Sequence, residues 1–170
     1  MPITPTPAEL AWLDQEDRRV TQTVRRYGVA LEHVWGDGAA RRPSFTYTVG
    51  LFGIDHPELL VFDLTPEDAA ELLNTMAARV RAGEDFVAGT IVKPFEGDPS
   101  HPHADRRVGL EWVPNPGEIV FSANRFAHRP SEYSVPALQI VWTDDAGRFP
   151  RDDGYAQPLW RQPTPGTFRA

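Results

Sequence analysis

The sequence contains no cysteine, and Lys93 is its single lysine. Without cysteine the chain cannot form disulfide bonds, thiolate nucleophiles, iron–sulfur clusters or zinc sites built on thiolates. No stretch approaches the ~18 apolar residues that a membrane-spanning helix needs, so we expect no membrane association. Residues 1–10 lack the basic and apolar regions of a signal peptide, and we therefore expect a cytoplasmic protein.

Acidic residues outnumber basic ones, 24 to 17, so the formal net charge is -7. This balance argues against a nucleic-acid partner, because phosphate binding needs a clustered excess of Lys and Arg. The Walker loop and the GxGxxG, GxSxG and HExxH motifs are all absent, which argues against dinucleotide enzymes and serine hydrolases of standard type. Hydrophobic residues make up 41% of the chain, which is enough to fill the core of a globular domain.

The patterning of the remaining residues predicts one α+β domain over residues 1–150. We expect two to three helices on a mixed or mainly antiparallel sheet. The predicted strands are residues 28–35, 45–51, 58–64, 86–93, 107–113 and 134–143, and the predicted helices are residues 6–27, 65–83 and 116–127. Within the last segment, Ile119, Val120 and Phe121 alone would also suit a strand. Residues 151–170 are rich in proline and without periodicity, so we expect a tail that is extended over the surface or partly disordered.

Two helix starts carry capping residues. Thr6 and Glu9 have the spacing of a capping box around Pro7, and Thr65 precedes Pro66 in the same way. We therefore expect the two longest helices to begin there.

The strand at residues 45–51 has two different faces. Phe45, Tyr47 and Val49 alternate with Thr46, Thr48 and Gly50. Small polar residues on one face leave room for a ligand, but they equally suit a strand that is covered by a helix.

We expect a small polar pocket beside this strand. Its candidate ligand-binding residues are Tyr47, Thr48, His56, Glu58, Gln139, Trp142 and Asp144.

Three of these features allow two interpretations each. His56 and Glu58 could form an acid–base pair, or His56 could be a turn residue while Glu58 pairs with an arginine. Asp144 and Asp145 could be paired carboxylates, or they could stabilise a turn that ends at Gly147. Gln139 lies within an apolar strand and must find partners, so it either ties down a loop or faces a cavity.

The histidines at positions 101 and 103 are weak candidates for metal ligands. Imidazoles on alternate residues of an extended chain could share a metal ion, with Asp98 or Asp105 as an oxygen donor. Because solvated histidines are common in proline-rich loops, we assign no metal site.

Several segments resemble a known bacterial family that is described only as a domain of unknown function. The segments are FTYTVGL at residues 45–51, HPEL at 56–59 and ALQIVWTDDAGRFP at 137–150, and the likeness extends over about residues 27–150. Thr143 and Arg151 depart from the proline and the tryptophan that are usual in the family. The resemblance implies a domain but no activity.

A fainter similarity, to flavin-reductase split barrels, comes from the threonine-rich strand and the strand and helix after it. It implies FMN or FAD as a possible cofactor. The sequence thus leaves three hypotheses: a small-ligand-binding or regulatory domain, a flavin-dependent or other small-molecule enzyme, and an accessory or immunity-type domain with a protein partner. It does not decide whether the protein is an enzyme.

Overall fold

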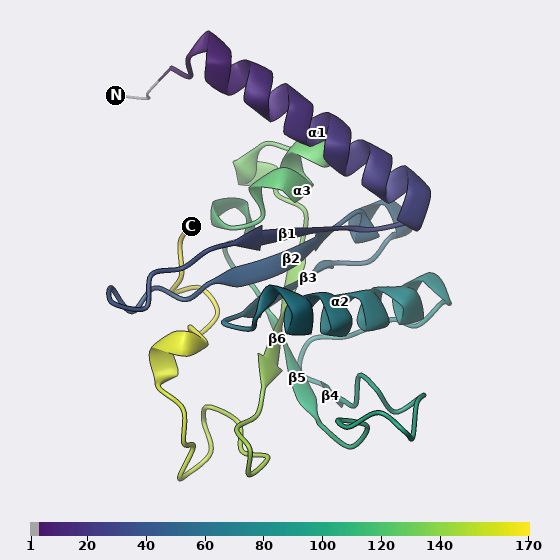
Figure 1. The fold of residues 1–170 in the computed structure, drawn as a ribbon, viewed down its shortest axis with the longest axis vertical. Helices are drawn as coiled ribbons and strands as arrows, with labels where there is room; N and C mark the ends of the chain where they lie inside the picture. The colour runs from purple at the N-terminus through teal and green to yellow at the C-terminus, as the bar shows by residue number, and fades with distance from the viewer. Residues whose placement is uncertain (1–3) are drawn as a thin grey trace.

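The computed structural model describes residues 4–170, which form one α+β domain with three α-helices and a six-stranded sheet (Figure 1). The helices are α1 (Pro7–Tyr27), α2 (Pro66–Arg81) and α3 (Phe121–Phe126). The strands are β1 (Ala30–Val34), β2 (Phe45–Val49), β3 (Glu58–Phe62), β4 (Ile91–Val92), β5 (Val108–Trp112) and β6 (Ala137–Trp142). The order in the sheet is β1-β2-β3-β6-β5-β4, and only the β3–β6 pair is parallel. The predicted fold class is confirmed.

The two capping signals act as expected. Thr6 accepts a hydrogen bond from the Glu9 N–H, and the Glu9 carboxylate accepts one from the Thr6 N–H at 2.7 Å, which completes the capping box of α1. The Thr65 hydroxyl accepts from the Asp68 N–H at the start of α2. Helix α1 ends at Gly28, whose φ of 84° is left-handed.

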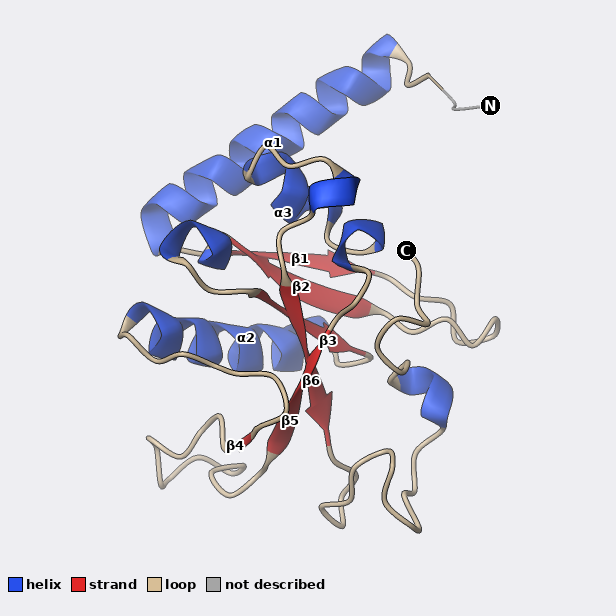
Figure 2. Ribbon diagram, turned by 180° about the vertical axis from the view of Figure 1, so that it is seen from behind, coloured by secondary structure: helices blue, strands red, loops and turns tan. Residues whose placement is uncertain are grey.

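Helices cover both faces of the sheet (Figures 1 and 2). The apolar side of α2, with Leu73 and Met76, packs on Leu59 and Ile140. The opposite face carries a second core, in which Phe45 and other aromatic residues meet side chains of α1 and α3. Thr46 and Thr48 alternate with residues of this second core and are buried. Strand β2 contacts α2, so the helix-covered interpretation of its threonine face is correct.

Two predicted elements differ in the structure. The strand expected at residues 86–93 is regular only at β4. Before β4, Gly89 has a left-handed φ of 84° that interrupts the extended chain, although the backbones of Gly89 and Thr90 still hydrogen-bond to Leu110. The helix expected at 116–127 is divided into a 3-10 turn at Pro116–Glu118 and the short helix α3. Between them Ile119 and Val120 leave helical geometry and are buried in the second core.

The sheet is open and strongly twisted, so that β1 and β2 cross β5 and β6 at a large angle (Figure 2). Strands β1 and β4 form its two edges within the described residues. The sheet is therefore not closed into a barrel within residues 4–170. None of the helices in residues 4–170 is both long and apolar enough to cross a membrane.

The C-terminal tail runs across the sheet face opposite α2. It contains turns at residues 151–154 and 165–167 and a 3-10 turn at Leu159–Arg161. Near its end the Phe168 ring packs edge-on against Phe45 and Phe62, with centroids 5.3 and 4.9 Å apart. The tail therefore contributes to the second core and covers the sheet beyond it.

Candidate functional site

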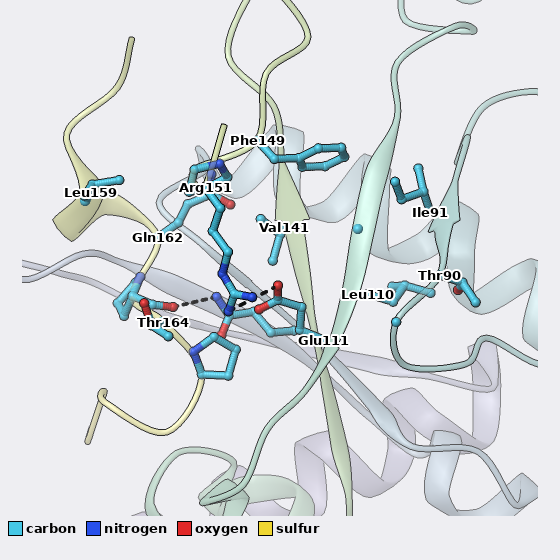
Figure 3. A pocket seen from close by; sticks show the side chains of 16 residues that line it. Thr90, Ile91, Leu110, Glu111, Val141, Phe149, Arg151, Leu159, Gln162 and Thr164 are labelled. Atoms are coloured by element: carbon cyan, nitrogen blue, oxygen red, sulfur yellow. Dashed lines mark hydrogen bonds and ion pairs between the residues drawn. The ribbon is translucent and has the colours of Figure 1, made fainter. Parts of the chain in front are cut away.

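A pocket of about 320 Å³ lies over β5 and β6, between the sheet and the C-terminal tail (Figure 3). Its floor consists of two cross-strand pairs, Gly109 with Val141 and Glu111 with Gln139. These four residues share one face because side chains alternate along each strand. One half of the floor is therefore apolar and the other half is polar.

Gly109 opens the apolar half. A Cβ atom added there would lie 3.7 Å from the Phe149 ring and 3.9 Å from the Val141 Cβ, which are ordinary contact distances. The glycine thus leaves space that a larger side chain would fill without moving the backbone. Phe149 forms the wall above this half (Figure 3).

The tail forms the opposite wall through Leu159 and residues 162–165. Gln162 holds it in place, because its side-chain amide accepts from the Trp142 N–H and donates to the Trp142 carbonyl, both at 2.9 Å. The Gln139 amide donates to the Pro163 carbonyl at 2.8 Å. Gln139 therefore meets both expectations at once, since it ties down a segment and faces a cavity.

Three polar groups at the pocket have unused hydrogen-bonding capacity. Within residues 4–170 the Glu111 carboxylate accepts no hydrogen bond, and its nearest cation, the Arg151 guanidinium, is 3.7 Å away, too far for one. Arg151 likewise donates no hydrogen bond to any described residue. Gln139 is only 2% exposed, yet its Oε1 has no donor among the same residues. The Glu111 and Arg151 side chains are accessible to solvent, so a ligand in the pocket can reach their charged groups.

Of the predicted site residues, Gln139 is the one that lines this pocket. The structure does not bring the other six together with it. Their polar side-chain atoms form hydrogen bonds elsewhere in the protein.

Glu58 is the first residue of β3, beside the end of the antiparallel strand β2, and is 1% exposed. Its Oε1 accepts from the N–H groups of Gly50 (2.9 Å) and Phe52 (3.2 Å), and its Oε2 accepts from the Thr48 hydroxyl (2.6 Å) and the Leu51 N–H (3.3 Å). Burial raises the pKa of the Glu58 carboxyl, and the hydrogen bonds oppose this rise. The partners of the Glu58 carboxylate are therefore three backbone N–H groups of a turn and the Thr48 hydroxyl. The arginine that one interpretation of the sequence assigned to Glu58 is not among them.

His56 is a structural link between two loops. Its Nδ1 donates to the Pro57 carbonyl at 2.7 Å, and its Nε2 accepts from the Phe86 N–H at 3.0 Å. Both ring nitrogens are therefore occupied, and the partners fix the neutral tautomer with the proton on Nδ1. His56 makes no hydrogen bond to Glu58. The two residues therefore do not form an acid–base pair, and His56 is a turn residue.

Tyr47 and Trp142 are anchored on opposite faces of the sheet. The Tyr47 hydroxyl accepts from the Ser122 N–H at 3.1 Å, and burial raises the pKa of this phenol. The Trp142 indole donates to the Phe62 carbonyl at 2.8 Å. Both polar tips thus tie neighbouring elements together.

Asp144 organises the turn after β6. Its carboxylate accepts from the N–H groups of Ala146, Arg148 and Ala156, at 2.9–3.0 Å, and from the Arg148 guanidinium at 3.0 Å. Burial would raise the pKa of Asp144, but these hydrogen bonds outweigh it and hold the pKa below the usual range. The turn interpretation therefore describes Asp144, while Asp145 points to solvent.

The histidine loop is fixed to α2. His101 donates from Nε2 to the Glu71 carboxylate at 2.8 Å, accepts from the His103 N–H at 3.0 Å and stacks on Phe95. Both nitrogens of His101 are therefore occupied. In the described part of the chain no group of three or more His, Asp or Glu residues is placed to hold a metal ion.

The sequence reasoning missed Gly109, Glu111, Phe149 and Arg151. A signal for the first two exists, because a glycine and a carboxylate alternate with apolar residues in the strand that contains them. The contribution of Arg151 depends on how the chain turns back after β6, which no local pattern reveals.

The comparison with protein families identifies the domain. A family model matches residues 23–156, which is well over half of the chain. The chain belongs to the family described as a domain of unknown function, DUF4262. The DUF4262 match includes the pocket floor, Phe149 and Arg151, but it stops before the tail wall at residues 159–165. No curated protein matches the chain.

Proposed function

We propose that this DUF4262 domain binds a small molecule in the pocket over β5 and β6. The observation that carries the proposal is the buried Gln139 amide in the pocket floor, whose oxygen has no donor among residues 4–170, beside a Glu111–Arg151 ion pair that forms no hydrogen bond. Apolar walls with a few convergent polar groups are typical of ligand sites. A volume of about 320 Å³ suits a small metabolite.

The lining residues favour binding over acid–base catalysis. Among the residues of 4–170 that line the pocket, Glu111 is the one carboxylate, and histidine and serine are not represented. A general acid and base need two titratable groups with separate tasks in reach of the substrate. The pocket instead offers recognition groups: a carboxylate, a guanidinium and an amide.

The test fills the pocket by substitution. Gly109→Val should fold, because valine suits a strand and the added Cβ meets only ordinary contacts. Gly97→Val is the matched control, because nothing lies within 4 Å of its added Cβ and Gly97 is outside the pocket. A metabolite library, including FMN and FAD, is screened by thermal shift against the wild type and both variants.

We expect at least one compound to raise the melting temperature of the wild type and Gly97→Val but not of Gly109→Val. At about 100-fold excess over Kd the stabilisation is about 2.7 kcal/mol, or roughly 5–10 °C for a domain of this size. Compounds that stabilise all three proteins equally bind elsewhere, and that result would contradict the proposal. A broad library without any Gly109-dependent compound would also contradict it.

A further inference from the structure

The two halves of the pocket floor require different chemistry from a ligand. Gly109 and Val141, below the Phe149 ring, offer only apolar contact. Glu111 and Gln139 form the next cross-strand pair on the same face and offer three oxygens without donors among the described residues. A complementary ligand therefore has an apolar body and, at one end, a hydrogen-bond donor.

Arg151 adds a second requirement at the same polar end. Its guanidinium reaches toward Glu111 from the chain that follows β6 (Figure 3). The 3.7 Å separation is an ion pair without a hydrogen bond, and the Arg151 side chain is 75% exposed. A guanidinium with unused donors is well suited to a carboxylate, which it can bind through two parallel hydrogen bonds.

We infer that the ligand is a small zwitterion with an apolar side chain, as in an apolar α-amino acid. This inference rests on the proposed function and names its ligand class. The ligand ammonium donates to Glu111 and to the Gln139 oxygen, its carboxylate accepts from Arg151, and its side chain lies against Val141 and Phe149.

A ligand with a single charge fits this site less well. A carboxylate bound to Arg151 alone lies close to the Glu111 carboxylate, which repels it at this distance. An amine bound to Glu111 alone meets the Arg151 guanidinium in the same way. A zwitterion that lies alongside the Glu111–Arg151 ion pair, with its charges in the opposite order, is attracted by both side chains.

The inference is tested by isothermal titration calorimetry of the 170-residue chain with a series of matched ligands. Phenylalanine is compared with 2-phenylethylamine, which lacks the carboxylate, with 3-phenylpropionate, which lacks the amine, and with glycine, which lacks the apolar body. Each analogue should bind roughly 10-fold to 100-fold more weakly than phenylalanine, the loss expected for one hydrogen-bonded charged group or one buried ring.

Charge-neutral variants assign each contact. Arg151→Gln should weaken phenylalanine to the level of 2-phenylethylamine, and Glu111→Gln should weaken it to the level of 3-phenylpropionate. Arg106→Gln is the matched control, because Arg106 forms a similar ion pair at 3.8 Å, with Asp145, and does not line the pocket. It should leave all four affinities unchanged.

The outcomes separate the inference from the proposed function. If 2-phenylethylamine or 3-phenylpropionate binds as tightly as phenylalanine, the zwitterion inference is wrong. It is also wrong if no amino acid binds while some other compound binds in a manner that Gly109→Val abolishes, but the binding function then stands. If no compound of any class binds in a Gly109-dependent manner, both are overturned.

Discussion

Two glutamates on neighbouring parts of the same sheet have opposite environments. Glu58, at the start of β3, is almost fully buried and accepts four hydrogen bonds. Glu111, on β5, is 32% exposed at its side chain and accepts none from the described residues. The difference shows that a carboxylate with every acceptor position filled is a structural element, whereas one with open positions is available to a ligand.

The Glu58 cluster stabilises a turn that has no other means of satisfying its backbone. Gly50 has a φ of 118°, and the chain then enters the 3-10 turn Leu51–Ile54 with three N–H groups directed at one carboxylate. Buried N–H groups without acceptors are costly, so the carboxylate offsets a cost that the turn creates. At Glu111, in contrast, no N–H group of residues 4–170 depends on the carboxylate as its acceptor.

The largest effect we predict separates the two glutamates directly. Glu58→Gln replaces one carboxylate oxygen by an NH₂ group, which leaves two buried donors facing a third, so the free energy of unfolding should fall by about 2–4 kcal/mol. Glu111→Gln should change it by less than about 0.5 kcal/mol, as is usual for a surface substitution without bonded partners. Urea denaturation of both variants measures the contrast. Equal losses in the two variants would remove the distinction on which the site assignment depends.

A smaller effect is expected where the tail closes the pocket. Gln162→Ala leaves the Trp142 N–H without its acceptor and releases the tail wall, so stability should fall by about 1–2 kcal/mol. Ligand affinity should fall with it, and trypsin should cleave after Arg161 faster than in the wild type. Gln22→Ala, at an exposed position of α1, is the control. A variant with unchanged cleavage and affinity would show that the tail is held by other contacts.

Much of the fold could be predicted from local signals. The capping box at Thr6 and the cap at Thr65 fix the starts of the two long helices, because a cap acts within one turn of the chain. The alternation in residues 45–51 predicts the correct faces of β2, because successive side chains of a strand point to opposite faces. Gly89 escaped notice because a left-handed φ in one residue is a property of the backbone that composition alone does not specify.

The site was harder to predict because its parts come together only through sheet pairing. Glu111 and Gln139 are direct neighbours in the β5–β6 register, although 28 positions of sequence numbering separate them. Polar residues in apolar strands were correctly identified as unusual, but the pattern could not distinguish Glu58, whose partners lie within ten positions, from Gln139, which faces a cavity. Glu58 and Gln139 differ in whether all acceptor atoms of the side chain have donors, and this depends on the three-dimensional structure.

The smallest effect we predict is the pH dependence of the Glu58 contribution. Burial places the folded-state pKa of Glu58 above its ordinary value of 4.5, so the folded state binds a proton more tightly than the unfolded state. The stability that Glu58 contributes relative to Gln is then fully present below about pH 4.5 and declines as the pH rises through the folded pKa. Urea denaturation of the wild type and Glu58→Gln between pH 4 and pH 8 should show that the variant's deficit in the free energy of unfolding shrinks with rising pH.

Asp144→Asn is the contrasting control. The pKa of Asp144 is lowered, so the deficit of this variant in the free energy of unfolding should stay constant above pH 5 and shrink only in acid. A Glu58→Gln deficit that grows with rising pH would mean that the four hydrogen bonds outweigh burial and that the cluster is built around an ionised carboxylate.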